Sequence, residues 1–230
     1  MRPFLEPFFI TGLGTEILYS FIIIACSLLV YFSTKELYEL SSYKGIKYFR
    51  LSFLFFAIAY FFRSFIKFVL VFFNVRAIHE FSPNIFMPMG SLTLVLFMYF
   101  SSMALFYLLY SVMWKKWNGN SKKIYLLHAI AIVISLLTAI SGEPSFLLLI
   151  NLFFFVLVSF IFYIAHKNFK DKKKGNTLYA IYMLLFVFWM LNLIDILVPS
   201  FLQGFQLFIY LASSGIFLAI LYKVLKKTGN

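Results

Sequence analysis

Seven long apolar stretches, separated by short polar gaps, dominate the pattern of hydrophobic and polar positions along this chain. An α-helix needs about 20 apolar residues to cross roughly 30 Å of hydrocarbon, and each stretch is close to or above that length. In lipid the backbone must satisfy its own hydrogen bonds, so each stretch is predicted to be a helix. The predicted spans are approximately 15–37, 47–74, 87–114, 123–141, 145–166, 176–198 and 203–224.

The gaps between the spans are short and carry turn-forming residues, such as Gly142 with Pro144 and Pro199 with Ser200. They leave no room for a separate soluble domain. The sequence therefore predicts an all-α polytopic membrane protein in which residues 1–230 form a single seven-helix transmembrane domain.

The composition agrees with this fold class, because 63% of the residues are hydrophobic and only 12% are charged. The net charge of +12 does not indicate nucleic-acid binding, because the cations follow the gaps between spans. Of the 20 lysines and arginines, 16 fall in the first, third and fifth gaps and the C-terminal tail. Loop cations stay cytoplasmic. We therefore expect an N-terminus outside, a C-terminus in the cytoplasm, and a multi-pass protein of the cell membrane.

Small residues predict which spans pack closely, since they let helix backbones approach in lipid. The last span carries Gly215 and Ala219 one turn apart, and the third carries Ser101, Ser102 and Ala104. These two spans are expected near the centre of the bundle. The fifth, mostly Leu, Phe, Val and Ile, is expected to face lipid over much of its surface.

Arg63 and Lys67 are the main functional candidates, because charges inside a span are costly and by default suggest function. They are four residues apart and share a helix face, with Tyr60 on roughly the same stripe. Counted along the predicted span, Arg63 falls close to the bilayer centre and Lys67 in the outer half. A guanidinium donates in a fork to carboxylate or phosphate, whereas an ammonium acts as a point charge.

Polar residues at similar depth on other spans predict an outward-facing polar cavity with its floor near Arg63. The main wall residues are Asp195, Asn192 and Gln206, and the others are Glu16, Asn151, Trp189, Gln203 and Tyr210. Two cations would face one well-buried acid, Asp195, with Glu16 shallower, and the surplus positive charge would suit an anionic ligand. Alternatively, these charges only pair with one another and fix the helices.

No catalytic, metal-binding or cofactor motif is found. His79, His128 and His166 lack the paired spacing of zinc or haem ligands and are interpreted as single polar residues at interfaces. Cys26 is a single cysteine, and Ser213 with Ser214 has no histidine at matching depth to activate it. We therefore expect no enzyme activity, no catalytic residues, no metal and no cofactor.

The layout resembles the seven-helix membrane regions that precede signalling domains in some prokaryotic histidine kinases. The resemblance covers most of the chain. It rests on seven short-looped spans with the N-terminus outside, the stretch 51–63 ending in Arg63, and the ending 221–227. It implies a sensory role. The chain ends where a signalling domain would begin, so any output is expected to pass to a separate partner at the basic inner loops.

The predicted function is that of a receptor-like or sensory membrane protein that binds a small anionic or amphipathic ligand. Arg63 and Lys67 would hold the anion, and Asp195, Asn192 and Gln206 would shape the wall. The alternative is a small-solute transporter or channel lined by the same residues, although the inner half has few polar residues. The expected partners are membrane lipids, the ligand and a cytoplasmic signalling protein, and not nucleic acid.

Overall fold

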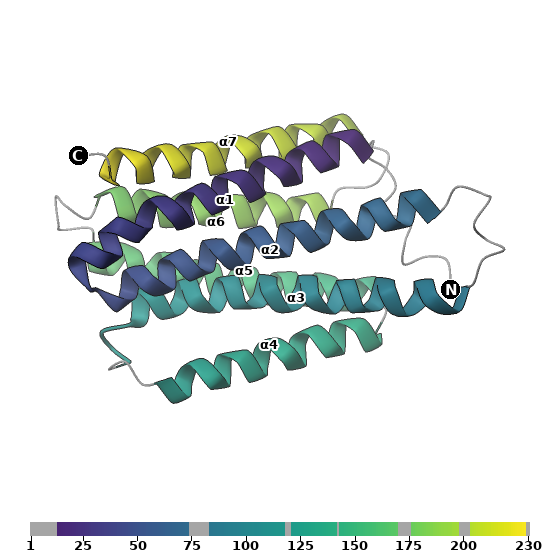
Figure 1. Ribbon diagram of the computed structural model, residues 1–230, viewed down its shortest axis with the longest axis horizontal. Helices are drawn as coiled ribbons and strands as arrows, with labels where there is room; N and C mark the ends of the chain where they lie inside the picture. Colours follow the sequence, from purple (N-terminus) through teal and green to yellow (C-terminus); the bar gives the residue numbers. More distant parts are fainter. Residues whose placement is uncertain are drawn as a thin grey trace.

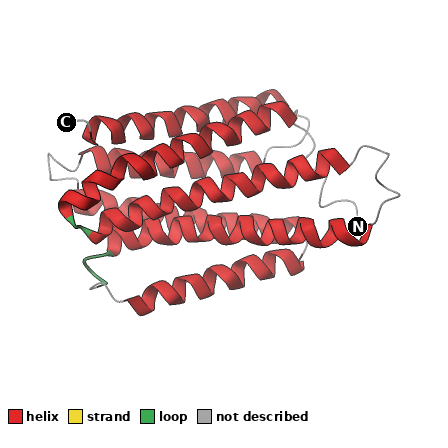
Figure 2. Ribbon diagram, in the orientation of Figure 1, coloured by secondary structure: helices red, strands yellow, loops and turns green. Residues whose placement is uncertain are grey.

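The computed structural model describes residues 13–73, 83–117, 121–141, 143–169, 176–197 and 203–228, and within these ranges its regular structure is entirely helical (Figures 1 and 2). The helices are α1 (Leu13–Ser41), α2 (Lys44–Phe73), α3 (Pro83–Met113), α4 (Ser121–Ser141), α5 (Pro144–Phe169), α6 (Asn176–Leu197) and α7 (Gln203–Thr228). In the described part of the chain, all seven are long and apolar enough to cross a membrane. The predicted spans are confirmed to within a few residues, and the fold is that of a multi-pass membrane protein.

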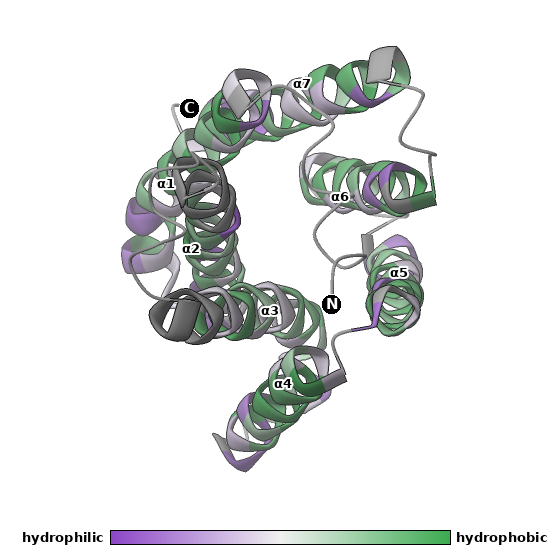
Figure 3. Cartoon of the chain, turned by 90° about the vertical axis from the view of Figure 1, so that its right-hand side faces the viewer, coloured by the Kyte–Doolittle hydropathy of each residue, from purple (hydrophilic) through white to green (hydrophobic). Residues whose placement is uncertain are grey.

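The helices follow one another around the bundle in the order α4, α3, α2, α1, α7, α6, α5 (Figure 3). The packing of α3 against α5 closes this ring. The described part of α3 is the most buried of the seven and that of α4 the least. The predicted central place of α3 is therefore confirmed, and the most peripheral helix is α4. On α5, a stripe that includes Ile150, Phe154 and Val158 is buried, while much of the remaining surface is exposed.

Phenylalanines from three helices fill the middle of the bundle. Phe217 of α7 packs edge-to-face against Phe188 of α6 at 4.8 Å between ring centroids, and against Phe56 of α2 at 6.2 Å. Phe53 lies 6.1 Å from Phe56 and is fully buried. Aromatic pairs at these separations add to the stabilisation from area burial alone.

The prediction that Gly215 mediates close helix packing is wrong. Gly215 is exposed, and a Cβ added there would meet nothing within 4 Å. The buried face of α7 instead carries Ser213, Phe217 and Ile220. Small residues show where backbones are able to approach, but the larger apolar residues on the neighbouring stripe decide which face is turned inward.

A tight turn joins α1 to α2. Ser42 adopts a left-handed conformation with φ of 49°, and its amide donates to the Tyr38 carbonyl at 2.8 Å, closing the end of α1. Gly45 follows in the first turn of α2. A Cβ at Gly45 would collide with the Tyr43 ring and would lie 3.2 Å from the Ser111 carbonyl oxygen of α3. The missing side chain therefore allows α2 to begin in close contact with α3.

Gly45→Ala is expected to lower the free energy of unfolding by about 1–3 kcal/mol, the usual cost of overpacking. Gly215→Ala is the matched control, because open space surrounds that position. It should be neutral or stabilising by up to about 1 kcal/mol, since alanine favours the helix. Denaturant unfolding of both variants in the same detergent gives the comparison. Equal stability of the two variants would contradict the close approach at Gly45.

Candidate functional site

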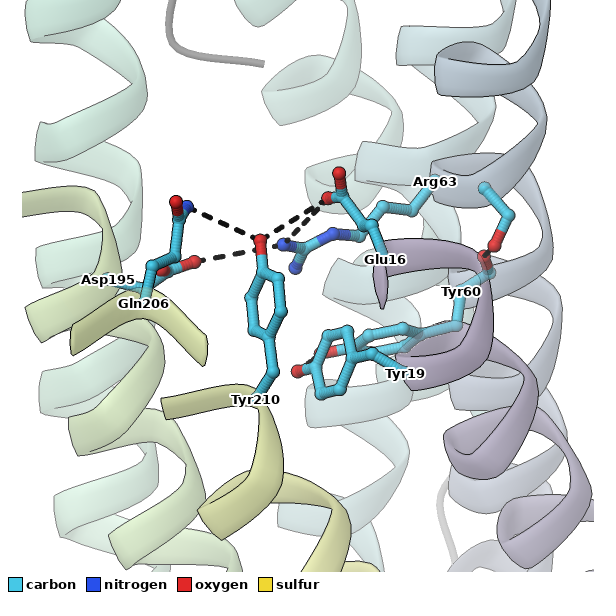
Figure 4. A network of polar contacts seen from close by, with 8 residues as sticks. Glu16, Tyr19, Tyr60, Arg63, Asp195, Gln206 and Tyr210 are labelled. Atoms are coloured by element: carbon cyan, nitrogen blue, oxygen red, sulfur yellow. Dashed lines mark hydrogen bonds and ion pairs between the residues drawn. The ribbon is translucent and has the colours of Figure 1, made fainter. Parts of the chain in front are cut away.

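The charged site lies at one end of the bundle, where four helices bring ionisable side chains together (Figure 4). Arg63 comes from α2, Glu16 from the first turn of α1, and Asp195 from the last turn of α6. Tyr210 is contributed by α7. We call Glu16, Tyr19, Tyr60, Arg63, Asp195, Gln206 and Tyr210 the Arg63 cluster.

A single guanidinium nitrogen links the two carboxylates. Nη2 of Arg63 lies 3.7 Å from Oε1 of Glu16 and 3.8 Å from Oδ2 of Asp195. Glu16 is only 2% exposed, Asp195 11% and Arg63 18%. Strong charge-assisted hydrogen bonds are about 2.7–2.9 Å long, so these two ion pairs are loose. Within the described residues, the remaining N–H groups of Arg63 form no hydrogen bond.

Three tyrosines pack beneath the guanidinium. The Tyr19 ring stacks on Tyr210 at 4.5 Å between centroids and meets Tyr60 edge-on at 5.8 Å. The hydroxyl groups of Tyr19 and Tyr60 are hydrogen-bonded at 3.1 Å. The guanidinium carbon of Arg63 lies 5.7 Å from the Tyr19 ring centre and 5.6 Å from that of Tyr60. These electron-rich faces attract the cation and support it where water is scarce.

A polar chain extends from the cluster along α7. Gln206 Nε2 donates to the Tyr210 hydroxyl at 3.4 Å, and that hydroxyl donates to Oε1 of Glu16 at 3.5 Å. Gln206 lies in the first turn of α7, so the chain runs toward the helix end. The predicted grouping of Arg63, Asp195, Gln206 and Tyr60 is therefore present in the structure.

Of the other predicted residues, Asn192 contacts the cluster through a side-chain hydrogen bond with Tyr60. Asn192 donates to the Phe188 carbonyl of its own helix at 2.9 Å, and Asn151 likewise bonds its own helix at the Leu147 carbonyl. The buried indole nitrogen of Trp189 has no hydrogen-bond partner among the described residues. Lys67 follows Arg63 by one turn of α2, but its side chain lies outside the described residues, as does that of Gln203.

The structure also gives the burial and the position of the three charged groups of the cluster. Glu16 is the most buried of the three charged groups. Arg63 is paired with residues in the first turn of α1 and the last turn of α6. Beyond it, α2 continues past the ends of α1, α6 and α7 (Figure 1). Among the described side chains, the cluster contains two carboxylates and one guanidinium. The predicted surplus of positive charge also counts Lys67, whose side chain is not described, and it stays a prediction.

Tyr19 is the member of the cluster that sequence reasoning missed. It lies on a buried stripe of α1 that continues from Glu16 through Ile23, Cys26 and Val30. The spacings of three and four residues along this stripe place all five side chains on one helix face. That spacing could have identified Tyr19, because it is the next polar residue after Glu16 on the same helix face and is therefore a candidate for the same site.

A second polar group joins α4 to α3. His128 of α4 is hydrogen-bonded through Nδ1 to the Tyr99 hydroxyl at 2.8 Å and through Nε2 to the Tyr107 hydroxyl at 3.0 Å. A neutral imidazole donates from one nitrogen and accepts at the other, so one tyrosine donates and the other accepts. The interpretation of His128 as an interface residue agrees with this geometry, but its two partners were not predicted.

The chemistry available to the Arg63 cluster is ionic and aromatic. No group of three or more His, Cys, Asp or Glu side chains that could hold a metal is found among the described residues. One cation that bridges two acids from different helices can fix those helices, and an anion can compete with either acid for it. Arg63 can therefore connect these helices through its two acids, and an anion can replace either acid as its partner.

Comparison with protein-family models gives no match, and no solved structure matches the chain. An uncharacterized protein of the archaeon Archaeoglobus fulgidus is 32% identical over 218 residues, covering 94% of this chain and 93% of that protein. Similarity over nearly the whole of both chains extends across all seven helices. The chain belongs to the same family as this uncharacterized archaeal protein.

Proposed function

We propose that this protein is a receptor-like sensor in the cell membrane, with the Arg63 cluster as its ligand-responsive site. In this proposal the start of α1 is outside and the end of α7 is cytoplasmic. The α1–α2 turn, the α3–α4 connection and the end of α7 lie together at the opposite end of the bundle from the cluster (Figure 1). Most of the cations are near these segments, which supports the orientation under the positive-inside rule.

The observation that carries the proposal is the loose pairing of Arg63 with acids from two other helices. Both ion pairs use Nη2 at 3.7–3.8 Å, so the planar fork of the guanidinium is not engaged by either carboxylate. A small carboxylate or phosphate ligand offers bidentate geometry that the internal acids do not achieve. Such a ligand, anionic or amphipathic, would compete with Glu16 and Asp195 for Arg63.

Exchange of partners at Arg63 would change how the helices are held. Asp195 is in the last turn of α6 and Glu16 in the first turn of α1, so a displaced carboxylate has a short path to solvent. Its departure would release α6 or α1 from α2. A ligand shifts a conformational equilibrium only by its difference in affinity for the two states, and competition for Arg63 supplies such a difference. Lys67, one turn further along α2, is proposed as a second cation for the ligand.

A sensor is favoured over a transporter because phenylalanines fill the bundle between the Arg63 cluster and the end of the bundle that carries most of the cations. Phe53, Phe56, Phe188 and Phe217 occupy that part of the bundle, all nearly or fully buried. A charged solute would lose its hydration on passing them, which is costly. As in the histidine kinase membrane regions that the layout resembles, we propose that the signal leaves as helix movement, here toward a cytoplasmic partner.

The test is thermal unfolding of the purified protein in detergent with a panel of carboxylates, phosphates and amphipathic anions, alongside neutral and cationic compounds. A ligand at 100 times its dissociation constant stabilises the native state by about 2.7 kcal/mol. We expect at least one anion to stabilise the wild type and to lose its effect in Arg63→Lys, which keeps the charge and removes the fork. Lys47→Gln, at the opposite end of α2, should respond as the wild type does. Stabilisation only by neutral or cationic compounds would overturn the proposal.

A further inference from the structure

The α1–α2 turn and the α3–α4 connection carry an unusual density of positive charge. Residues 42–73 and 83–141 contain no aspartate or glutamate. Seven cations lie near the α1–α2 turn and the α3–α4 connection. These are Lys44, Lys47, Arg50, Lys115, Lys116, Lys122 and Lys123. The α1–α2 turn and the α3–α4 connection lie at the same end of the bundle (Figure 1), so the charges add to one local positive field.

Three of these lysines hold their amino groups over aromatic rings. Nζ of Lys44 lies 5.4 Å from the centre of the Trp114 ring, and Nζ of Lys123 lies 5.1 Å from that of Trp117. Nζ of Lys115 lies 6.0 Å from the Tyr43 ring. We call these six residues the lysine–aromatic patch. A ring face attracts an ammonium without neutralising it, so the charge remains available to an anion.

The two tryptophan rings of the patch are fixed by the bundle and do not depend on the lysines. Trp114 packs against Tyr48 of α2 and Tyr110 of α3, each at 5.6 Å between ring centroids, and Trp117 packs against Tyr110 at 5.3 Å. Tyr110 is fully buried. The ammonium groups of Lys44 and Lys123 therefore lie over fixed rings before any ligand arrives, which lowers the entropic cost of binding.

The described residues offer no carboxylate partner to these ammonium groups. Within the described residues, no ion pair joins Lys44, Lys115 or Lys123 to a carboxylate. Elsewhere at the same end of the bundle the charges are used internally. Lys35 pairs with Glu39 at 3.7 Å, and Nε of Arg50 donates to the Tyr31 carbonyl at 3.1 Å. In the described part of the chain, the patch thus carries positive charge that no carboxylate compensates.

We propose that the lysine–aromatic patch binds the phosphate headgroup of an anionic phospholipid. The patch lies where α2, α3 and α4 begin or end, which is the depth of the headgroups in a bilayer. Tryptophan and tyrosine favour that same depth, since one part of each ring system is apolar and the other polar. Each lysine near an anionic leaflet raises the affinity about fivefold, so three fixed ammonium groups distinguish anionic from zwitterionic lipid.

Tryptophan fluorescence gives a direct test, because two of the three tryptophans belong to the patch. A Trp189→Phe background leaves Trp114 and Trp117 as the only reporters. The protein is reconstituted in phosphatidylcholine bilayers containing an equal mole fraction of brominated phosphatidylglycerol or brominated phosphatidylcholine, whose bromine atoms quench nearby indoles. We expect a preference for phosphatidylglycerol of at least about fivefold, the contribution of one lysine.

The variant Lys44→Gln/Lys115→Gln/Lys123→Gln should show no preference, a ratio of about one, because it removes the charges and leaves the rings. The matched control, Lys167→Gln/Lys223→Gln/Lys226→Gln, removes three cations from the same end of the bundle outside the patch. It should keep the preference. Circular dichroism establishes that both variants fold. The lipid preference of the Trp189→Phe protein itself is measured without either variant, so the test does not depend on their folding.

Two results would overturn the proposal. Equal quenching by the two lipids in the Trp189→Phe protein would show that the patch does not select an anionic headgroup. The second result is that inorganic phosphate abolishes the phosphatidylglycerol preference while an equal concentration of chloride has little effect. That result would assign the patch to a soluble anion. A preference that resists phosphate and disappears only in the patch variant supports the lipid site.

Discussion

Arg63→Gln is expected to lower the free energy of unfolding by about 3–5 kcal/mol, the typical cost of removing one partner from a buried ion pair. The substitution would leave the carboxylates of Glu16 and Asp195 without their shared cation, although the two are only 2% and 11% exposed. An uncompensated charge in this environment costs more than the pair contributes. Denaturant unfolding in detergent, followed by circular dichroism, measures the loss.

Neutralising the acids should recover part of that loss. In the triple variant Glu16→Gln/Arg63→Gln/Asp195→Asn no buried charge remains in the described cluster, and the amide groups keep the shapes of the carboxyl groups. We expect it to be at least about 1–2 kcal/mol more stable than Arg63→Gln alone. Lys47→Gln, an exposed lysine of the same helix, should change stability by less than about 0.5 kcal/mol. An Arg63→Gln protein as stable as the wild type would show that the cluster does not stabilise the helix bundle.

His128→Phe is expected to cost about 2 kcal/mol, because it removes two hydrogen bonds and leaves the hydroxyls of Tyr99 and Tyr107 without their shared partner. Hydrogen bonds between membrane helices average about 0.6 kcal/mol, and an unsatisfied buried hydroxyl adds to the loss. The effect should concentrate on α4, which packs mainly against α3. Faster hydrogen exchange along residues 121–141, together with a lower unfolding midpoint, is the expected result.

His166→Phe provides the control for the histidine substitution. His166 of α5 packs against Tyr179 at 5.3 Å and Phe162 at 6.3 Å between ring centroids. Its ring nitrogens form no hydrogen bond among the described residues, so phenylalanine preserves the packing and removes no polar contact. Its stability should stay within about 0.5 kcal/mol of the wild type. Equal losses for His128→Phe and His166→Phe would mean that ring packing, not hydrogen bonding, holds α4.

The helices could be predicted from the sequence, because each span is a local property set by length and hydrophobicity. The order of the helices around the bundle could not, because in lipid nearly every face is apolar and hydrophobicity no longer marks the inside. Gly215 shows this limit. Its spacing from Ala219 indicates a packing face, yet the buried side of α7 is the stripe with Ser213 and Phe217.

The cluster could be predicted in part. Arg63 and Asp195 stood out because charges within spans are rare, and the structure brings them together. The burial of Glu16 could not be deduced, because it depends on α7 covering the start of α1 with Tyr210. Tyr19 and the partners of His128 were missed because tyrosine is abundant in this chain, and abundance weakens any single position as a signal.

The position of Glu16 on α1 bears on how the chain is made. A ribosome delivers α1 and α2 before the other helices, and segments assemble in that order as they emerge. Arg63 would be costly to insert by itself, but Glu16 on the preceding helix offers a counter-charge from the moment α2 enters the bilayer. Asp195 arrives only after most of the chain has been synthesised. The first two helices can thus enter the membrane with Arg63 already paired to Glu16, and Asp195 joins this pair when the bundle closes.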